Sequence, residues 1–253
     1  MLFHKCFLYL LSLLYTCFLN ILSLLQNRLI PYTEEIDWEN QLIGISGARG
    51  CGKTSLLIQH LKSISPKNTA LYVSLDDLFF TENELMYFAE DFHKMGGKYL
   101  FLDEVHKYPN WSQEIKNIYD SLPNMKVVFT SSSALEIYKD SHDLSRRVLI
   151  YHLPGLSFRE FLKLKYKIIL PKLTMAEIIL SHIESSHNIM GAIKPLALFK
   201  EYLKGGYYPF FKDTGSAYLK QLMNTVNLVV ESDLPAINKI DFINKLIITT
   251  FTK

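Results

Sequence analysis

Residues 47–54 read Gly47-Ala48-Arg49-Gly50-Cys51-Gly52-Lys53-Thr54, which fits the pattern G-x-x-x-x-G-K-[ST] of a phosphate-binding loop. The flanking segments fit as well, since residues 42–46 predict a short buried strand and residues 55–61 begin a predicted helix. A strand, a glycine-rich turn and a helix in this order favour a phosphate-binding loop over an ordinary glycine-rich turn.

Each residue type in this loop suits a triphosphate. Glycines allow backbone N–H groups to turn inward around phosphate oxygens, and the helix N-terminus adds a partial positive charge. Lys53 is expected to contact the β- and γ-phosphates, and the Thr54 hydroxyl is expected to ligate Mg²⁺. The expected nucleotide-binding residues of this loop are Gly47, Ala48, Arg49, Gly50, Cys51, Gly52, Lys53, Thr54 and Ser55.

A second motif is the apolar strand at residues 98–104, which ends in the two carboxylates Asp103 and Glu104. This is the Walker B form, in which Asp103 would hold Mg²⁺ and Glu104 would polarise the attacking water. The alternative is an ordinary strand with an acidic turn, which the loop one strand unit upstream disfavours. Together the two motifs predict that the protein binds a nucleoside triphosphate with Mg²⁺.

The composition limits the number of domains and the class of protein only broadly. The 253 residues allow one large domain or two smaller ones, and 49% apolar with 21% charged residues is typical of a folded globular protein. The net charge of +2 gives no overall electrostatic argument for nucleic acid. Residues 1–140 carry 12 Lys and Arg against 16 Asp and Glu, whereas residues 141–253 carry 15 against 9. The positive part permits an anionic partner, but a solvated basic face is favoured.

The three cysteines, Cys6, Cys17 and Cys51, have neither C-x-x-C spacing nor zinc-finger partners. A disulfide framework and a metal site built on them are therefore disfavoured. A reducing compartment fits best, so we expect a cytoplasmic protein.

Residues 6–25 are apolar except for one narrow polar stripe of helical spacing, and no charged residue lies between Lys5 and Arg28. Twenty such residues can span a bilayer. Two interpretations remain, a membrane anchor or an amphipathic helix packed on its own domain, and the polar stripe favours packing.

The middle of the chain alternates strands with helices, which predicts an α/β fold with a parallel sheet covered on both faces. Thr81 to Glu84 has the form of a capping box for a helix that runs to about Met95. Beyond residue 155 the pattern is helical, with capping-box shapes at residues 157–160 and 174–177. The expected strands are residues 42–46, 70–74, 98–104, 126–130 and 148–152. The expected parts are an apolar helix (1–30), a P-loop core (31–155) and a helical region (156–253).

These residues resemble the prokaryotic AAA+-like ATPases that carry a C-terminal domain of unknown function, a family common in Bacteroidetes and archaea. The resemblance covers residues from about 30 to 210, and its most specific part runs from Asp103 to Trp111. The matching stretches are residues 47–54, 102–111, 129–133, 143–147 and 156–162.

The resemblance implies further site residues. The segment Thr130-Ser131-Ser132 would supply the sensor hydroxyl between the two Walker strands, from Thr130 or Ser131 first of all, with a polar strand end as the alternative. Arg146 or Arg147 would be the family's arginine near the fifth strand, which contacts phosphate in the same or a neighbouring subunit, or else pairs with Asp143. The resemblance also implies a lid or winged-helix-like region and an incomplete C-terminal domain, so we expect a truncated family member.

The leading hypothesis is an ATPase that hydrolyses ATP to ADP and phosphate with Mg²⁺. The second is a nucleotide-gated interaction module, in which ATP orders a surface for a protein partner, a second copy or DNA. A membrane-associated ATPase, held through residues 6–25, and a small-molecule kinase are further alternatives. Residues 238–241 spell N-K-x-D, but their place after a long helix disfavours GTP. Asp76 and Asp77 end a strand on the nucleotide side of the sheet, where they either support the site or cap a helix.

Overall fold

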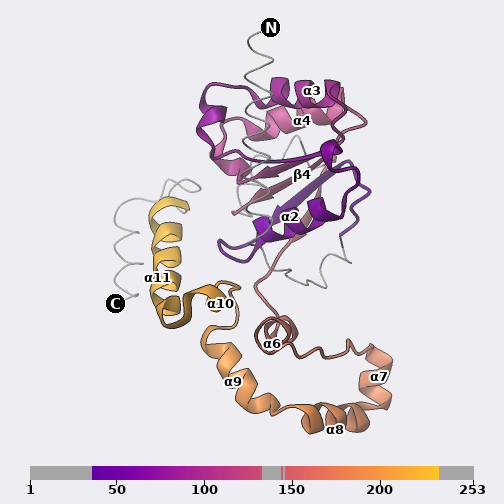
Figure 1. Cartoon of the computed structure of the whole chain (residues 1–253), viewed down its shortest axis with the longest axis vertical. Coiled ribbons are helices and arrows are strands. Elements are labelled where there is room, and N and C mark those ends of the chain that lie inside the picture. Colours follow the sequence, from indigo (N-terminus) through magenta and orange to yellow (C-terminus); the bar gives the residue numbers. More distant parts are fainter. Residues whose placement is uncertain (1–35, 133–143, 145, 234–253) are drawn as a thin grey trace. The chain divides into compact units, whose positions relative to one another are not determined.

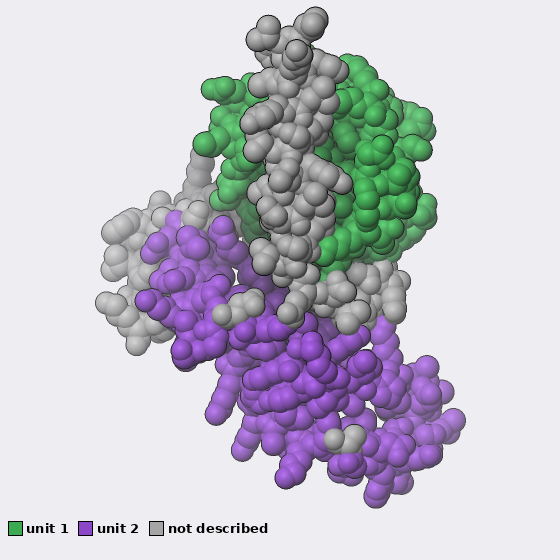
Figure 2. Space-filling model, viewed as in Figure 1, with its two compact units in different colours: residues 1–48, 53–153 green, residues 49–52, 154–253 purple. Residues whose placement is uncertain are grey.

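The structure is a computed structural model of the whole chain, and it describes residues 36–132, 144 and 146–233 (Figure 1). The predicted N-terminal helix, the segment around Asp143 and the N-K-x-D sequence lie outside these residues. The chain divides into two compact units, drawn in different colours in Figure 2. Unit 1 comprises residues 1–48 and 53–153, and unit 2 comprises residues 49–52 and 154–253.

Unit 1 contains a five-stranded parallel sheet with the strand order β2-β3-β4-β1-β5, which confirms the predicted fold class. The P-loop strand β1 pairs with β4 on one side and β5 on the other, so β4 separates it from the Walker B strand β3. The strands are β1 (Leu42–Ser46), β2 (Ala70–Ser74), β3 (Tyr99–Asp103), β4 (Lys126–Ser131) and β5 (Leu149–His152).

Helices cover both faces of this sheet (Figure 1). The helices α3 (Leu85–Lys94) and α4 (Trp111–Ser121) lie together on one face, and α2 (Lys53–Ser63) lies on the other. The α3–α4 face forms a continuous core in which Trp111 is buried and packs against Phe129, with ring centroids 5.6 Å apart. Because side chains alternate along a strand, the same strands bury residues on both faces, which explains their almost unbroken apolar sequences.

The predicted capping box at Thr81 is wrong. Thr81 ends a 3₁₀ helix, η3 (Leu78–Thr81), and α3 begins only at Leu85, without a side-chain cap from Glu84. The first N–H groups of α3 are bound instead from a distance, by the Tyr108 hydroxyl at 3.2 Å from the Leu85 nitrogen and by Glu114 Oε2 at 2.9 Å from the Met86 nitrogen. Tyr108 and Glu114 therefore accept hydrogen bonds from backbone N–H groups of the first turn, which an N-cap side chain accepts in most helices. Two shorter 3₁₀ helices complete unit 1, η2 (Lys67–Thr69) and η4 (Val105–Lys107).

The described part of unit 2 is helical after residue 154. The capping boxes predicted at Ser157 and Thr174 are both confirmed, at the starts of α6 and α7. A small aromatic core surrounds the buried Phe161 and Leu162 of α6. The helices are α6 (Phe158–Tyr166), α7 (Met175–Leu180), α8 (His182–Ala192), α9 (Pro195–Gly205), α10 (Phe211–Thr214) and α11 (Tyr218–Leu228), with a 3₁₀ turn η5 (Gly215–Ala217) and a π-helical end η6 (Val229–Asp233).

Candidate functional site

The phosphate-binding loop has the backbone that its glycines predict. Gly50 and Gly52 have φ angles of 80° and 99°, in the left-handed region that residues with a Cβ rarely enter. The helix α2 follows at once from Lys53, and its first turn carries no acidic residue. No acidic side chain of the first turn therefore offsets the partial positive charge at the N-terminus of α2.

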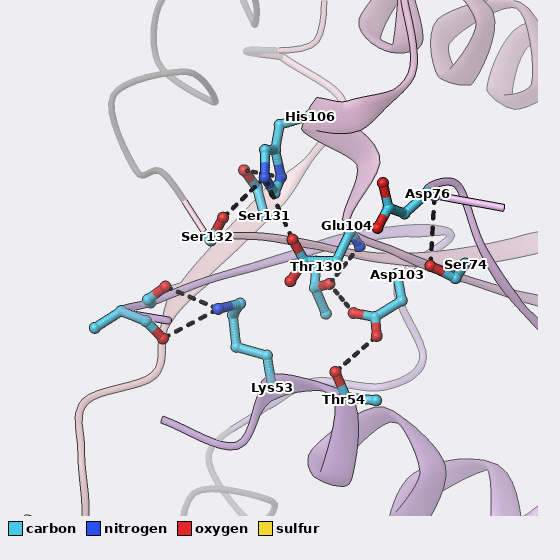
Figure 3. A network of polar contacts seen from close by, with 12 residues as sticks. Lys53, Thr54, Ser74, Asp76, Asp103, Glu104, His106, Thr130, Ser131 and Ser132 are labelled. Carbon is cyan, nitrogen blue, oxygen red and sulfur yellow. Dashed lines mark hydrogen bonds and ion pairs between the residues drawn. The ribbon is translucent and has the colours of Figure 1, made fainter. Parts of the chain in front are cut away.

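Lys53 is buried, with 5% of its surface exposed, and its ammonium group lies against the loop backbone (Figure 3). Its Nζ donates hydrogen bonds of 3.0 Å to the Gly47 carbonyl and 3.1 Å to the Ala48 carbonyl. A buried ammonium needs such acceptors, and phosphate oxygens are stronger acceptors than carbonyl oxygens because they are charged. Lys53 is thus placed where a phosphate chain can replace one neutral partner with an anionic one.

Three hydroxyl groups from three elements converge on the carboxylate of Asp103, which is 3% exposed (Figure 3 includes two of them). Thr54 on α2 donates to Oδ2 at 2.6 Å, and Tyr72 on β2 donates to the same oxygen at 2.8 Å. Thr130 on β4 donates to Oδ1. An ionised carboxylate only accepts hydrogen bonds, so the three hydroxyls can all act as donors to it and fix its orientation.

The oxygen atoms at this point fit Mg²⁺. Magnesium prefers hard oxygen ligands and in nucleotide sites uses one or two carboxylates together with phosphates and water. Thr54 and Asp103 bring a hydroxyl and a carboxylate oxygen to 2.6 Å from each other, beside the N-terminus of α2. Burial, followed by the neighbouring charge of Asp103, raises the pKa of Tyr72 above its usual value, so Tyr72 stays a hydrogen-bond donor.

Glu104 has an unusual backbone conformation for a residue with a long side chain. Its φ of 55° and ψ of 42° are left-handed, and its N–H donates to Thr130 Oγ1 at 3.1 Å. Such strain is found most often at functional sites, where surrounding contacts hold it in place. The carboxylate is partly exposed, and its Oε2 lies 3.3 Å from Nε2 of His106.

The two predicted sensor residues are fully buried at the end of β4. Thr130 connects the Walker B residues, because its hydroxyl donates to Asp103 and accepts from the Glu104 nitrogen. Ser131 pairs in register with Ser46, the residue before the phosphate-binding loop, and its Oγ lies 3.5 Å from His106 Nδ1. The two hydroxyls therefore have different partners.

The predicted arginines are placed differently. Arg147 forms a two-point ion pair with Asp120 on α4, with Nε–Oδ1 and Nη2–Oδ2 distances of 2.9 and 3.2 Å. Its guanidinium also lies 5.9 Å from the ring centroid of Tyr119. Arg146 is exposed. A phosphate contact by either residue stays a prediction.

Asp77 acts as a cap, one of the two interpretations open for it. Its Oδ1 accepts a hydrogen bond of 2.9 Å from the Phe79 nitrogen at the start of η3. Sequence reasoning missed Tyr72, although a tyrosine among the apolar residues of a buried strand was a usable signal, since a buried hydroxyl requires a partner.

None of the helices in the described ranges has the length and hydrophobicity needed to cross a bilayer. The interpretation of residues 6–25 lies outside those ranges.

Comparison with known proteins finds a matching family model and a related archaeal protein. Residues 39–162 match the family model described as an AAA domain. The uncharacterized protein MJ1637 of Methanocaldococcus jannaschii is 29% identical over 219 residues. That match covers 80% of this chain and 46% of the relative, so the chain spans about half the length of the curated relative it matches.

Solved structures with low overall similarity include AAA+ proteins. PCH-2 of C. elegans is 17% identical with a TM-score of 0.39, over 62% of this chain and 44% of that one. AMPPCP-bound DnaA of Aquifex aeolicus is also 17% identical with a TM-score of 0.39, over 87% and 69% of the two chains. The Hsp104–ADP complex of S. cerevisiae is 19% identical with a TM-score of 0.34, over 51% and 22%.

Proposed function

We propose that this chain is an AAA-type P-loop protein, in line with the AAA-domain match of residues 39–162, and that it binds ATP with Mg²⁺ and hydrolyses it to ADP and phosphate. The observation that carries the proposal is the convergence of Thr54 and Asp103, with Glu104 next in the chain. Hydrogen bonds join Thr54 to Asp103 and, through Thr130, Asp103 to the backbone of the proposed base Glu104.

Binding rests on the loop and on Lys53. Backbone N–H groups of residues 47–54 and the N-terminus of α2 surround the phosphates, and Ser55 belongs to the same first turn. The Lys53 ammonium exchanges its two carbonyl acceptors for β- and γ-phosphate oxygens. Thr54 and Asp103 would hold Mg²⁺, which would supply positive charge to stabilise the β- and γ-phosphates.

Hydrolysis rests on Glu104. Its carboxylate accepts a proton from a water molecule, the water oxygen forms a bond to the γ-phosphorus, and the bond to the bridging oxygen breaks to release ADP. The Thr130 hydroxyl fixes both Walker B residues, which preserves their relative orientation during the reaction. Ser131 as the sensor hydroxyl and Arg146 or Arg147 as a phosphate contact belong to the same proposal.

A second candidate is a nucleotide-gated interaction module. The described helices of unit 2 expose large apolar side chains, including Ile179 and Leu180 on α7 and Leu196 on α9. Exposed apolar side chains favour a protein partner, either a second copy or another protein, over nucleic acid. On this proposal, ATP binding would increase partner affinity, and hydrolysis would be slow or absent.

The deciding experiment measures ATP affinity with and without Mg²⁺, together with phosphate release, for wild type, Lys53→Ala and Glu104→Gln. We expect Lys53→Ala to lose binding, and Glu104→Gln to bind ATP with phosphate release lowered by about 10²- to 10⁴-fold. Glu82→Gln, an exposed carboxylate of unit 1, is the matched control and should behave as wild type.

Two results would change the conclusion. Phosphate release in wild type no faster than in Lys53→Ala would remove the hydrolysis proposal. Tight ATP binding without release, accompanied by an ATP-dependent increase in mass in sedimentation experiments, would favour the interaction module.

A further inference from the structure

His106 lies beside the carboxylate of Glu104, and the proposed ATPase mechanism gives this histidine no role. Nε2 of His106 lies 3.3 Å from Oε2 of Glu104, and the histidine side chain is 7% exposed against 23% for the glutamate (Figure 3). A nearly buried imidazole beside a partly exposed carboxylate, whose Oε2 is itself buried, can orient that carboxylate without contacting the substrate itself.

The backbone explains how these side chains meet. The left-handed conformation of Glu104 turns the chain directly into η4, where the Lys107 nitrogen donates to the Glu104 carbonyl at 2.9 Å. The next nitrogen, of Tyr108, donates to the Val105 carbonyl at 3.0 Å, and Val105 is fully buried. This tight turn brings the side chain of residue 106 back beside that of residue 104.

The imidazole also contacts the last residue of β4 and the residue after it. Nε2 lies 2.9 Å from Ser132 Oγ, and Nδ1 lies 3.5 Å from Ser131 Oγ. A Ser131 hydroxyl that donates to Nδ1 leaves the ring proton on Nε2, the nitrogen between Ser132 and Glu104. The ring therefore cannot rotate without losing contacts to both serines.

We propose that His106 is a positioning residue for Glu104, an inference that rests on the proposed ATPase function. Its Nε2, 3.3 Å from the buried Oε2, restrains that oxygen by close contact, which leaves Oε1 of Glu104 to accept the proton of the attacking water. Anchoring reduces the number of unproductive side-chain conformations of Glu104. The carboxylate is then already oriented for the reaction, which lowers the reaction barrier. Since Ser131 pairs with Ser46, the anchor is also joined to the strand that leads into the phosphate-binding loop.

A purely structural role for His106 makes different predictions. A residue that only fills the interior would affect stability and ATP binding as much as turnover, and its effect would be independent of the base. A positioning residue acts through Glu104 alone, so its effect vanishes once Glu104 can no longer act as a base.

The test compares His106→Gln, His106→Asn and His106→Ala, with and without Glu104→Gln, for kcat, KM for ATP, ATP affinity and melting temperature. A glutamine amide nitrogen can take the place of Nε2, whereas the shorter asparagine amide reaches only the place of Nδ1. We expect His106→Ala and His106→Asn to lower kcat by about 10- to 100-fold with KM and affinity within about twofold of wild type. His106→Gln should recover most of the rate, and His106→Ala should add no further loss in the Glu104→Gln protein.

His93→Ala is the matched control, because His93 is a histidine of the same unit with a backbone partner, the Gly97 carbonyl at 3.2 Å from Nδ1. It should leave kcat unchanged. If His106→Ala does not fold, the comparison of the two amide variants decides alone.

Equal rates for the Gln and Asn variants, or a His106→Ala effect that multiplies with that of Glu104→Gln, would overturn the inference and leave the ATPase proposal standing. Wild-type phosphate release equal to that of Lys53→Ala would instead remove the ATPase proposal, and the role of His106 with it.

Discussion

The hydroxyl of Thr54 donates a hydrogen bond of 2.6 Å to Oδ2 of Asp103, although the two residues are 49 positions apart in the sequence. This contact joins the first turn of α2 to the carboxyl end of β3. It brings together a hydroxyl and a carboxylate of the kind that bind Mg²⁺ with a nucleotide, at the edge of a parallel sheet where ligands bind.

Removing this hydroxyl should weaken the Mg²⁺-dependent part of ATP binding. Thr54→Ala should raise the Mg²⁺ concentration for half-maximal ATP binding by at least tenfold, because it deletes a metal ligand. Thr54→Ser keeps the hydroxyl and should stay within about threefold of wild type. Titration of Mg²⁺ at fixed ATP checks this, and equal values for the two variants would rule out a ligand role for Thr54. Chelating Mg²⁺ with EDTA should bring wild type to the level of Thr54→Ala.

Tyr72 should increase the Mg²⁺ affinity of the same site without contacting the nucleotide. Tyr72→Phe removes the 2.8 Å hydrogen bond to Asp103 Oδ2, so the carboxylate loses one of its orienting donors. A hydrogen bond to a charged group contributes about 1.5 kcal/mol or more, which corresponds to an Mg²⁺ affinity about tenfold weaker and an Mg²⁺ midpoint about tenfold higher. The same titration, with the exposed Tyr87→Phe as control, measures the change. An unchanged Mg²⁺ midpoint would mean that Tyr72 only fills the core.

The loop should not tolerate a Cβ at Gly52. Its φ of 99° is strained for an alanine, so Gly52→Ala should lower the free energy of unfolding by about 1–2 kcal/mol and weaken ATP binding by at least tenfold. Gly191→Ala is the control, since no atom lies within 4 Å of a Cβ at this helical position. It should be neutral or stabilising by up to about 1 kcal/mol. Denaturant unfolding and ATP titration test both variants, and equal effects at the two positions would contradict the prediction.

His60 should make the stability of unit 1 sensitive to acid. Burial, followed by the positive charge of Lys126, lowers the pKa of His60 from 6.5 to about 4, and the ring stacks on Trp38 with centroids 3.7 Å apart. Between pH 6.5 and 4 the unfolded chain binds the proton and the folded chain does not, so stability is lost as the pH falls through this window. His60→Phe keeps an aromatic ring beside Trp38 and removes this titration.

Urea midpoints at pH 7.5, 6 and 5 measure this effect. The wild-type midpoint should fall more steeply with acid than that of His60→Phe. Parallel curves would show that another group dominates the acid response.

Much of the fold follows from local sequence. The strands at residues 42–46 and 70–74 have the predicted bounds, and the capping boxes at Ser157 and Thr174 form as predicted, because each depends on residues close together in the chain. The left-handed glycines at 50 and 52 likewise follow from the loop pattern. Local sequence mispredicts a helix start where residues distant in the chain accept the hydrogen bonds of the first turn. This is the case at α3, whose first N–H groups donate to Tyr108 and Glu114.

The sequence by itself determined that this chain has a glycine-rich loop between a strand and a helix, a strand that ends in Asp103 and Glu104, and a parallel α/β sheet, since residue type and spacing suffice for these features. Only the tertiary structure decided which side chains meet there. The order β2-β3-β4-β1-β5 brings Tyr72 to Asp103 and the end of β4 to His106, and the sequence does not specify which partner either side chain meets. Contacts between strands depend on their neighbours in the sheet, which the order of strands along the chain does not specify.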